Sequence, residues 1–206
     1  MRRMKKVFRY ALPFMRSLAG VLPAAAGPTS MREYPLPDGS IFQMKVPVSW
    51  LHDFTAEPGE LPLSITLRPQ TGENFAVLVT PLPPAGNHSP PPTAAAIREH
   101  VELAGDKARP QAVEHMITIR EFRGTSGVGY YFPTTDKAPK PVEYKIMTQG
   151  IFGAGNLIVA FTVLKNEEQQ PIVDDALTII KGAVHTRAGA GEPDHAAFRR
   201  GTDASP

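Results

Sequence analysis

Apolar and polar residues alternate over several short stretches of the chain, which is the pattern of half-buried β-strands. Two of these stretches, 31–36 and 41–46, flank the sequence Pro-Asp-Gly-Ser at 37–40, where proline presets φ and glycine tolerates the positive φ of a tight turn. They predict an opening hairpin. Residues 63–67 and 75–79 predict a second hairpin by the same alternation.

An amphipathic segment in the middle of the chain predicts a helix over 94–107, with Thr93 as its N-cap and with Gly105 and Pro110 marking its end. The proline-rich stretch 81–92 before it predicts an extended connection that is neither helix nor the interior of a sheet.

The second half of the chain predicts four further strands and a final helix. The strands are expected at 115–122, 128–133, 142–152 and 157–164. The last strand is apolar on both faces, which is typical of a central strand. Asn166 is the predicted N-cap of the helix, whose apolar positions Ile172, Ala176 and Ile179 should pack on the sheet.

This order of elements indicates an α+β fold: one antiparallel sheet of six to seven strands flanked by helices, in an α/β/α sandwich. We expect a single domain over 31–185. Residues 186–206 are rich in Gly, Ala, Pro and charge without periodicity, which predicts a disordered tail.

Residues 1–26 have the outline of a secretory signal: a basic start, a short apolar stretch and Ala24-Ala25-Ala26 as a cleavage site. They predict a periplasmic or secreted protein. The alternative is a cytoplasmic protein that starts at a later Met or keeps a basic tail. No run of 18 apolar residues exists, so no transmembrane segment is expected.

Charge and cysteine content exclude several classes of function. Six of the 22 basic residues lie in 1–26, which leaves 16 basic against 20 acidic residues and a net charge of −4 in the rest of the chain. Such a body has no general attraction for nucleic acid. With no cysteine in the sequence, disulfides and thiolate chemistry are excluded. We predict no cofactor.

Three local features resemble the PsbP-like superfamily of exported proteins. They are the strand closing in Val-Pro-Val-Ser-Trp at 46–50, the small-residue turn 124–129 before an aromatic strand, and the pair 144–150 and 156–164 before a final helix. The resemblance covers about 33–185. It implies an antiparallel sheet flanked by helices and a non-enzymatic accessory or assembly role, and it carries over no functional residue.

The glycine-rich run 124–129 lacks the features of a phosphate-binding loop, because the aromatic residues after it favour a strand and no lysine is placed to bind a phosphate. Ser126 does not fit the esterase motif G-x-S-x-G, since residue 128 is Val. We therefore expect a turn or bulge here.

The histidines show no metal-ligand spacing. The alternative of an enzyme with an unrecognised hydrolytic site depends on His52, Asp53 and His115 meeting in the folded chain. We predict that the protein is not an enzyme and has no metal site.

Four aromatic residues are candidates for a partner-binding surface: Tyr130, Tyr131, Tyr144 and Trp50. The alternative is structural. Tyr130 would then face the core, Tyr131 would line a second covered face, and Trp50 would plug one end of the core at a strand-to-loop corner.

Together these features predict a non-enzymatic, exported accessory protein of the cell envelope that binds a protein partner. Two alternatives stay open: a cytoplasmic secretion-system accessory or partner-binding protein, and the hydrolytic enzyme described above.

Overall fold

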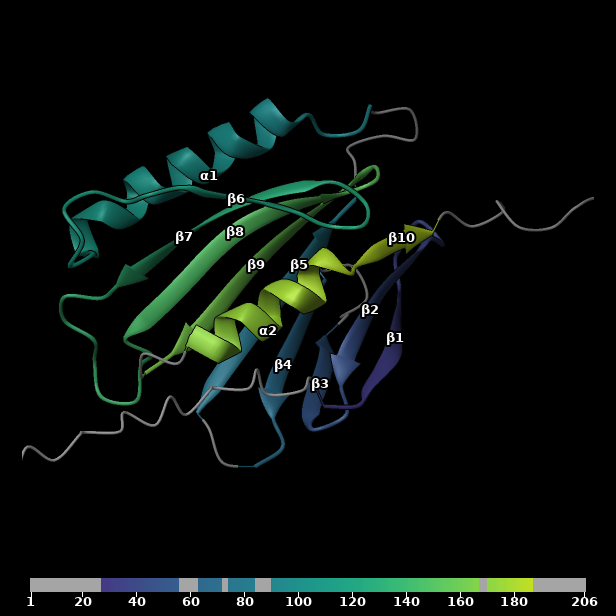
Figure 1. The fold of residues 1–206 in the computed structure, drawn as a ribbon, viewed down its shortest axis with the longest axis horizontal. Helices are drawn as coiled ribbons and strands as arrows, with labels where there is room; N and C mark the ends of the chain where they lie inside the picture. Colours follow the sequence, from purple (N-terminus) through teal and green to yellow (C-terminus); the bar gives the residue numbers. More distant parts are fainter. Residues whose placement is uncertain (1–26, 56–62, 72–73, 84–89, 167–169, 187–206) are drawn as a thin grey trace, which may run out of the picture.

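The fold combines antiparallel sheets with two α-helices, and strand predominates over helix (Figure 1). The computed structural model describes residues 27–55, 63–71, 74–83, 90–166 and 170–186. Within these ranges the elements are β1 Thr29–Pro35, β2 Ile41–Pro47, β3 Trp50–Thr55, β4 Ser64–Pro69, β5 Phe75–Leu82, α1 Ala94–Ala108, a 3₁₀ turn Arg109–Gln111, β6 Arg120–Arg123, β7 Val128–Thr135, β8 Ile146–Ala154, β9 Leu157–Lys165, α2 Gln170–Lys181 and β10 Val184–Thr186. The predicted α+β class is confirmed.

Seven strands form the large sheet in the order β3-β4-β5-β9-β8-β7-β6, with antiparallel pairing throughout. β9 is the middle strand, as its apolar sequence predicted. Its residues alternate between fully buried and half-buried positions, because one face of the sheet is covered more completely than the other.

A second, three-stranded sheet of order β1-β2-β10 packs with α2 over the better covered face. The large hydrophobic core lies between these layers and includes Phe42 and Met44 of β2, Phe161 of β9 and Ile180 of α2. The expectation of a single sheet in an α/β/α sandwich was wrong for this face. On this face the small sheet and α2 together cover the strands of the large sheet.

The opposite face carries α1, which packs against β7 and β8 (Figure 1). Thr93 caps this helix as predicted, since its hydroxyl accepts a hydrogen bond of 3.2 Å from the Ala96 amide. Ile97 and Val101 bury themselves with Phe132 in a smaller core. Gly105 lies inside the helix and does not end it.

Four local predictions need correction. Trp50 does not lead into a loop: the corner is at Val48 and Ser49, and Trp50 opens the unexpected strand β3. Of the strand predicted at 115–122, only the end is paired, as β6. Residues 115–119 are not a strand, although Ile117 and Ile119 still pack against the core beneath α1. The strand predicted at 142–152 is β8, which begins only at Ile146, after a turn that contains Val142.

The fourth correction concerns proline. Pro81 lies within β5, an interior strand, although we expected the proline-rich stretch to stay outside the sheet. The paired positions between β4 and β5 end at Ile65 and Val79, whereas Pro81 pairs with Val159 of β9. Pro81 is therefore locally at an edge, where a missing amide proton is tolerated.

The predicted hairpin of β1 and β2 is confirmed, with Gly39 at φ 79° in its turn. The short strand β10, which pairs with β2, was not predicted. The leader 1–26 and the tail from 187 onward lie outside the described residues. No helix in the described part of the chain is long and apolar enough to cross a bilayer.

Candidate functional site

A groove runs between α1 and the large sheet. We call the part lined by Lys107 and Lys145 the outer part, and its volume is about 400 Å³. The inner part, lined by Val101 and Phe132, has a volume of about 170 Å³. The two parts share Ala104 and Gln149. The outer volume is within the range of ligand-binding clefts. The floor consists of Met147, Gln149 and Ile151 of β8, which share a face because strand side chains alternate, together with residues of β9.

The space exists because α1 carries small side chains toward the sheet in its second half. Val101 fills the gap at the inner end, where it is buried, but Ala104 and Ala108 one and two turns later fill little of it. Leu164 and Thr134 complete the walls of the outer part. The lining is thus mainly apolar, with a few polar groups.

Charged and polar groups surround the outer end of the groove. Lys107 and Lys145 bring two cations to it and Asp136 brings one carboxylate. Thr135 is held in the wall by Glu114, which accepts hydrogen bonds of 2.8 Å from both its amide and its hydroxyl. Burial alone would raise the pKa of Glu114, but these hydrogen bonds lower it below its ordinary value.

The sheet continues beyond the groove without a described helix on the same face. Cross-strand pairing aligns Gln149, Thr162 and Leu78 in one row across β8, β9 and β5. The side chains of Thr162 and Leu78 are half-buried. In the described part of the chain α1 therefore covers one half of this face, and the groove lies at the border of the other half.

Tyr144 is the candidate aromatic residue that lines the groove. Its hydroxyl donates a hydrogen bond of 3.2 Å to the side-chain oxygen of Asn74. Trp50 lies toward the same end of the sheet, since it packs on Phe75, with 4.7 Å between the ring centroids. However, Trp50 joins the large core on the other face.

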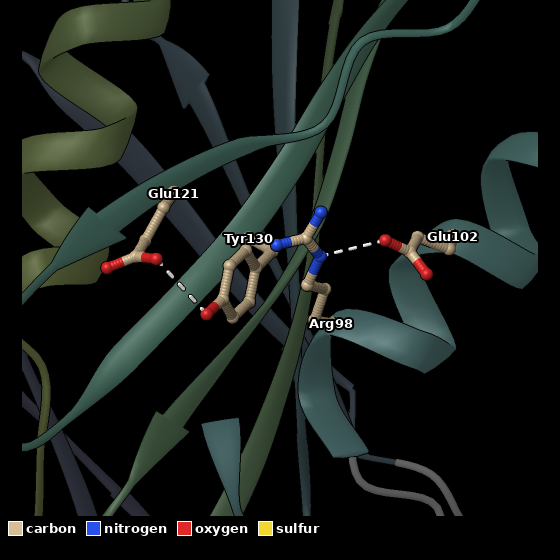
Figure 2. A network of polar contacts seen from close by, with 4 residues as sticks. All are labelled: Arg98, Glu102, Glu121 and Tyr130. Atoms are coloured by element: carbon tan, nitrogen blue, oxygen red, sulfur yellow. Dashed lines mark hydrogen bonds and ion pairs between the residues drawn. The ribbon is translucent and has the colours of Figure 1, made fainter. Parts of the chain in front are cut away.

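Tyr130 and Tyr131 are not among the residues that line the groove. The Tyr130 ring is buried beneath α1, and its hydroxyl donates a hydrogen bond of 3.2 Å to Glu121, beside the Arg98–Glu102 ion pair (Figure 2). Burial and this hydrogen bond raise the Tyr130 pKa. Tyr131 points to the opposite face and packs on Phe122. The four aromatics thus form no single surface.

The glycine-rich loop 124–129 binds the end of α2. The Thr125 amide donates a hydrogen bond of 2.7 Å to the carbonyl oxygen of Lys181, and the Ser126 hydroxyl donates one of 2.7 Å to that of Ala183. Helix C-termini carry partial negative charge, so this position would repel a phosphate. The predicted turn has a structural role.

The structure does not assemble the hydrolytic site that we considered. His52 and Asp53 are adjacent on β3 and point to opposite faces, and Asp53 pairs with Arg68. His115 precedes β6, which is the other edge strand of the sheet. Within the described ranges no three His, Asp or Glu side chains gather as a metal site.

A Ser–His–Asp set at the β1–β2 turn was not anticipated. His185 Nε2 lies 2.9 Å from the Ser40 hydroxyl, which donates a hydrogen bond to the Asp38 carboxylate. The Ser40 side chain is only 2% exposed, and the Ser40 amide also binds Asp38. A serine nucleophile must reach its substrate, so this set is a turn motif and not a catalytic triad.

No family model and no curated protein matches the sequence. A crystal structure of a protein from Bacteroides thetaiotaomicron VPI-5482, determined at 1.50 Å resolution, is similar with a TM-score of 0.42 and 17% sequence identity. The match covers 82% of this chain and 52% of that protein, so the chain spans about half of its length.

Proposed function

We propose that the protein is a non-catalytic accessory protein of the cell envelope that acts by binding a protein partner in the groove between α1 and the sheet. The groove carries this proposal, because it is an apolar cleft beside a half-covered sheet face with polar groups at one end. The PsbP-like resemblance of the sequence supports an accessory role.

Site-specific cross-linking tests the groove. A photoreactive amino acid at Met147 would report contacts on the groove floor, and one at Leu103, which is 53% exposed, would report random contacts on α1. We expect one defined cross-linked protein in the native envelope from position 147 and none from position 103. Equal products from both positions would refute a groove-specific partner.

A substitution that fills the groove, paired with a matched control outside it, tests the same site. Ala104→Leu adds side-chain volume where both parts of the groove meet, whereas Ala95→Leu adds the same volume at an exposed position of α1. Only A104L should abolish the cross-link from position 147. N-terminal sequencing of the mature protein tests export separately, since an intact Met1 would remove the signal-peptide part of the proposal.

A further inference from the structure

Three buried polar atoms on the other face of the large sheet have no hydrogen-bond partner among the described residues. They are the Arg32 Nε, the Tyr34 hydroxyl and the His52 Nδ1. The Tyr34 side chain is only 1% exposed. Buried polar groups in folded proteins are nearly always hydrogen-bonded, because an unpaired one has lost the hydrogen bonds that it made with water. Three such atoms in one region offer hydrogen-bonding capacity that the described side chains do not use.

The three side chains come from two strands that face each other across the layers. Arg32 and Tyr34 are two residues apart on β1 and therefore lie on the same face of that strand. The His52 ring of β3 meets the Tyr34 ring edge-on, with 6.0 Å between the centroids. The Phe54 ring also packs on the Tyr34 ring, with 5.4 Å between the centroids, and gives the site an apolar wall.

The neighbouring acidic residues do not neutralise this site. Glu33 of β1 points to the opposite face of its strand and accepts a hydrogen bond of 2.8 Å from Gln43. Asp53 of β3 points away from His52 and pairs with Arg68. The site therefore offers one fixed positive charge and hydroxyl and imidazole donors, without a matching acceptor among the described residues.

We infer that Arg32, Tyr34 and His52 form a binding site for a carboxylate. A carboxylate has two acceptor oxygens that can take the three hydrogen bonds, and its single charge matches the one guanidinium. A phosphate dianion would need more positive charge than the site holds. The carboxylate belongs either to a small free acid or to an acidic side chain of a protein, and both present the same group.

Titration of the full chain with sodium acetate tests the site. The ring nitrogens of His52 are followed by NMR, with acetamide and sodium chloride as controls, and the blocked peptide acetyl-Gly-Asp-Gly-amide represents a protein carboxylate. We expect a saturable shift of His52 Nδ1 and a rise in Tm with acetate, and neither with acetamide. Tighter binding of the peptide than of acetate would identify a protein source.

Two variants and one control locate the binding. Tyr34→Phe and Arg32→Gln should each weaken acetate binding about tenfold or more, which is the effect of losing a hydrogen bond to a charged group. Y34F removes an unpaired hydroxyl and keeps the ring, so it should fold. Arg68 of β4 pairs with Asp53 on the opposite face of β3 from His52, so Arg68→Gln should leave binding unchanged.

Three results would overturn the inference: an ordered water that bridges the three groups with no saturable response to acetate, equal acetate affinity in wild type and R32Q, or tighter binding of phosphate than of acetate. Each is independent of the groove, because His52 faces the other side of the sheet from the residues that line the groove.

Discussion

The hydroxyl of Ser126 donates a hydrogen bond of 2.7 Å to the carbonyl oxygen of Ala183, 57 residues further along the chain. This bond joins the glycine-rich loop to the link between α2 and β10. We expect Ser126→Ala to lower the free energy of unfolding by about 1 kcal/mol, because a buried carbonyl loses its donor. Urea denaturation measures this change.

The neighbouring residue Thr125 provides the control. Its side chain is exposed, and only its backbone amide binds α2, through Lys181. Thr125→Ala should therefore leave stability nearly unchanged. If S126A were as stable as T125A, the Ser126 hydroxyl would have no structural role.

A close approach of two backbones makes Gly127 irreplaceable. A Cβ added there would lie 2.2 Å from the carbonyl oxygen of Gly153, and neither backbone can move freely. We expect Gly127→Ala to destabilise the fold by about 3 kcal/mol through overpacking. Gly155 has φ +63° with open space around it, so Gly155→Ala should cost only about 1 kcal/mol. Equal losses in chemical denaturation would contradict this account.

Periodicity predicted most strands because successive side chains of a strand point to opposite faces, so that a buried face appears in the sequence as every second residue. The middle position of β9 followed from an apolar sequence on both faces, and the cap at Thr93 followed from its place before an amphipathic segment. The three residues of β10 were missed, since so short a strand depends on its partner β2 and has no period of its own. The failure at Pro81 has the same cause, because only the strand pairing reveals a local edge.

The candidate sites were less predictable than the fold. The groove depends on the absence of side-chain volume at Ala104 and Ala108, and alanine in a helix is unremarkable in sequence. Tyr144 was identified as an aromatic residue on a strand, although its place on the groove depends on the turn before β8. Arg32 and His52 meet near Tyr34 only because two separate sheets pack together.

Val142 adopts φ 69°, a left-handed backbone conformation that is unfavourable for a β-branched residue. Its side chain is fully exposed, so packing does not compensate for the strain. Val142→Gly should raise the free energy of unfolding by about 0.5–1 kcal/mol, since relief of strain exceeds the entropy cost of glycine. Val142→Ala keeps a Cβ and should gain less. A loss of stability in V142G would show that the turn is unstrained in solution.

Burial raises the pKa of Tyr34 to about 12, and the charge of Arg32 acts in the opposite direction with a smaller effect. An unfolded chain ionises this tyrosine near pH 10, so between about pH 10 and 12 the folded state holds more protons. The stabilisation is therefore complete below about pH 10 and is lost as pH rises through about 12.

Comparison with Tyr34→Phe isolates this titration, because the phenyl ring of the variant cannot ionise while all other groups titrate alike. The difference in unfolding free energy between wild type and Y34F should fall over the same pH range. Absorbance at about 295 nm should show one more late-titrating tyrosine in wild type than in Y34F, because Tyr130, whose pKa is also raised, titrates late in both proteins. A pH-independent difference between the two proteins would mean that the Tyr34 hydroxyl is hydrated in solution, and its burial between β1 and β3 would then be wrong.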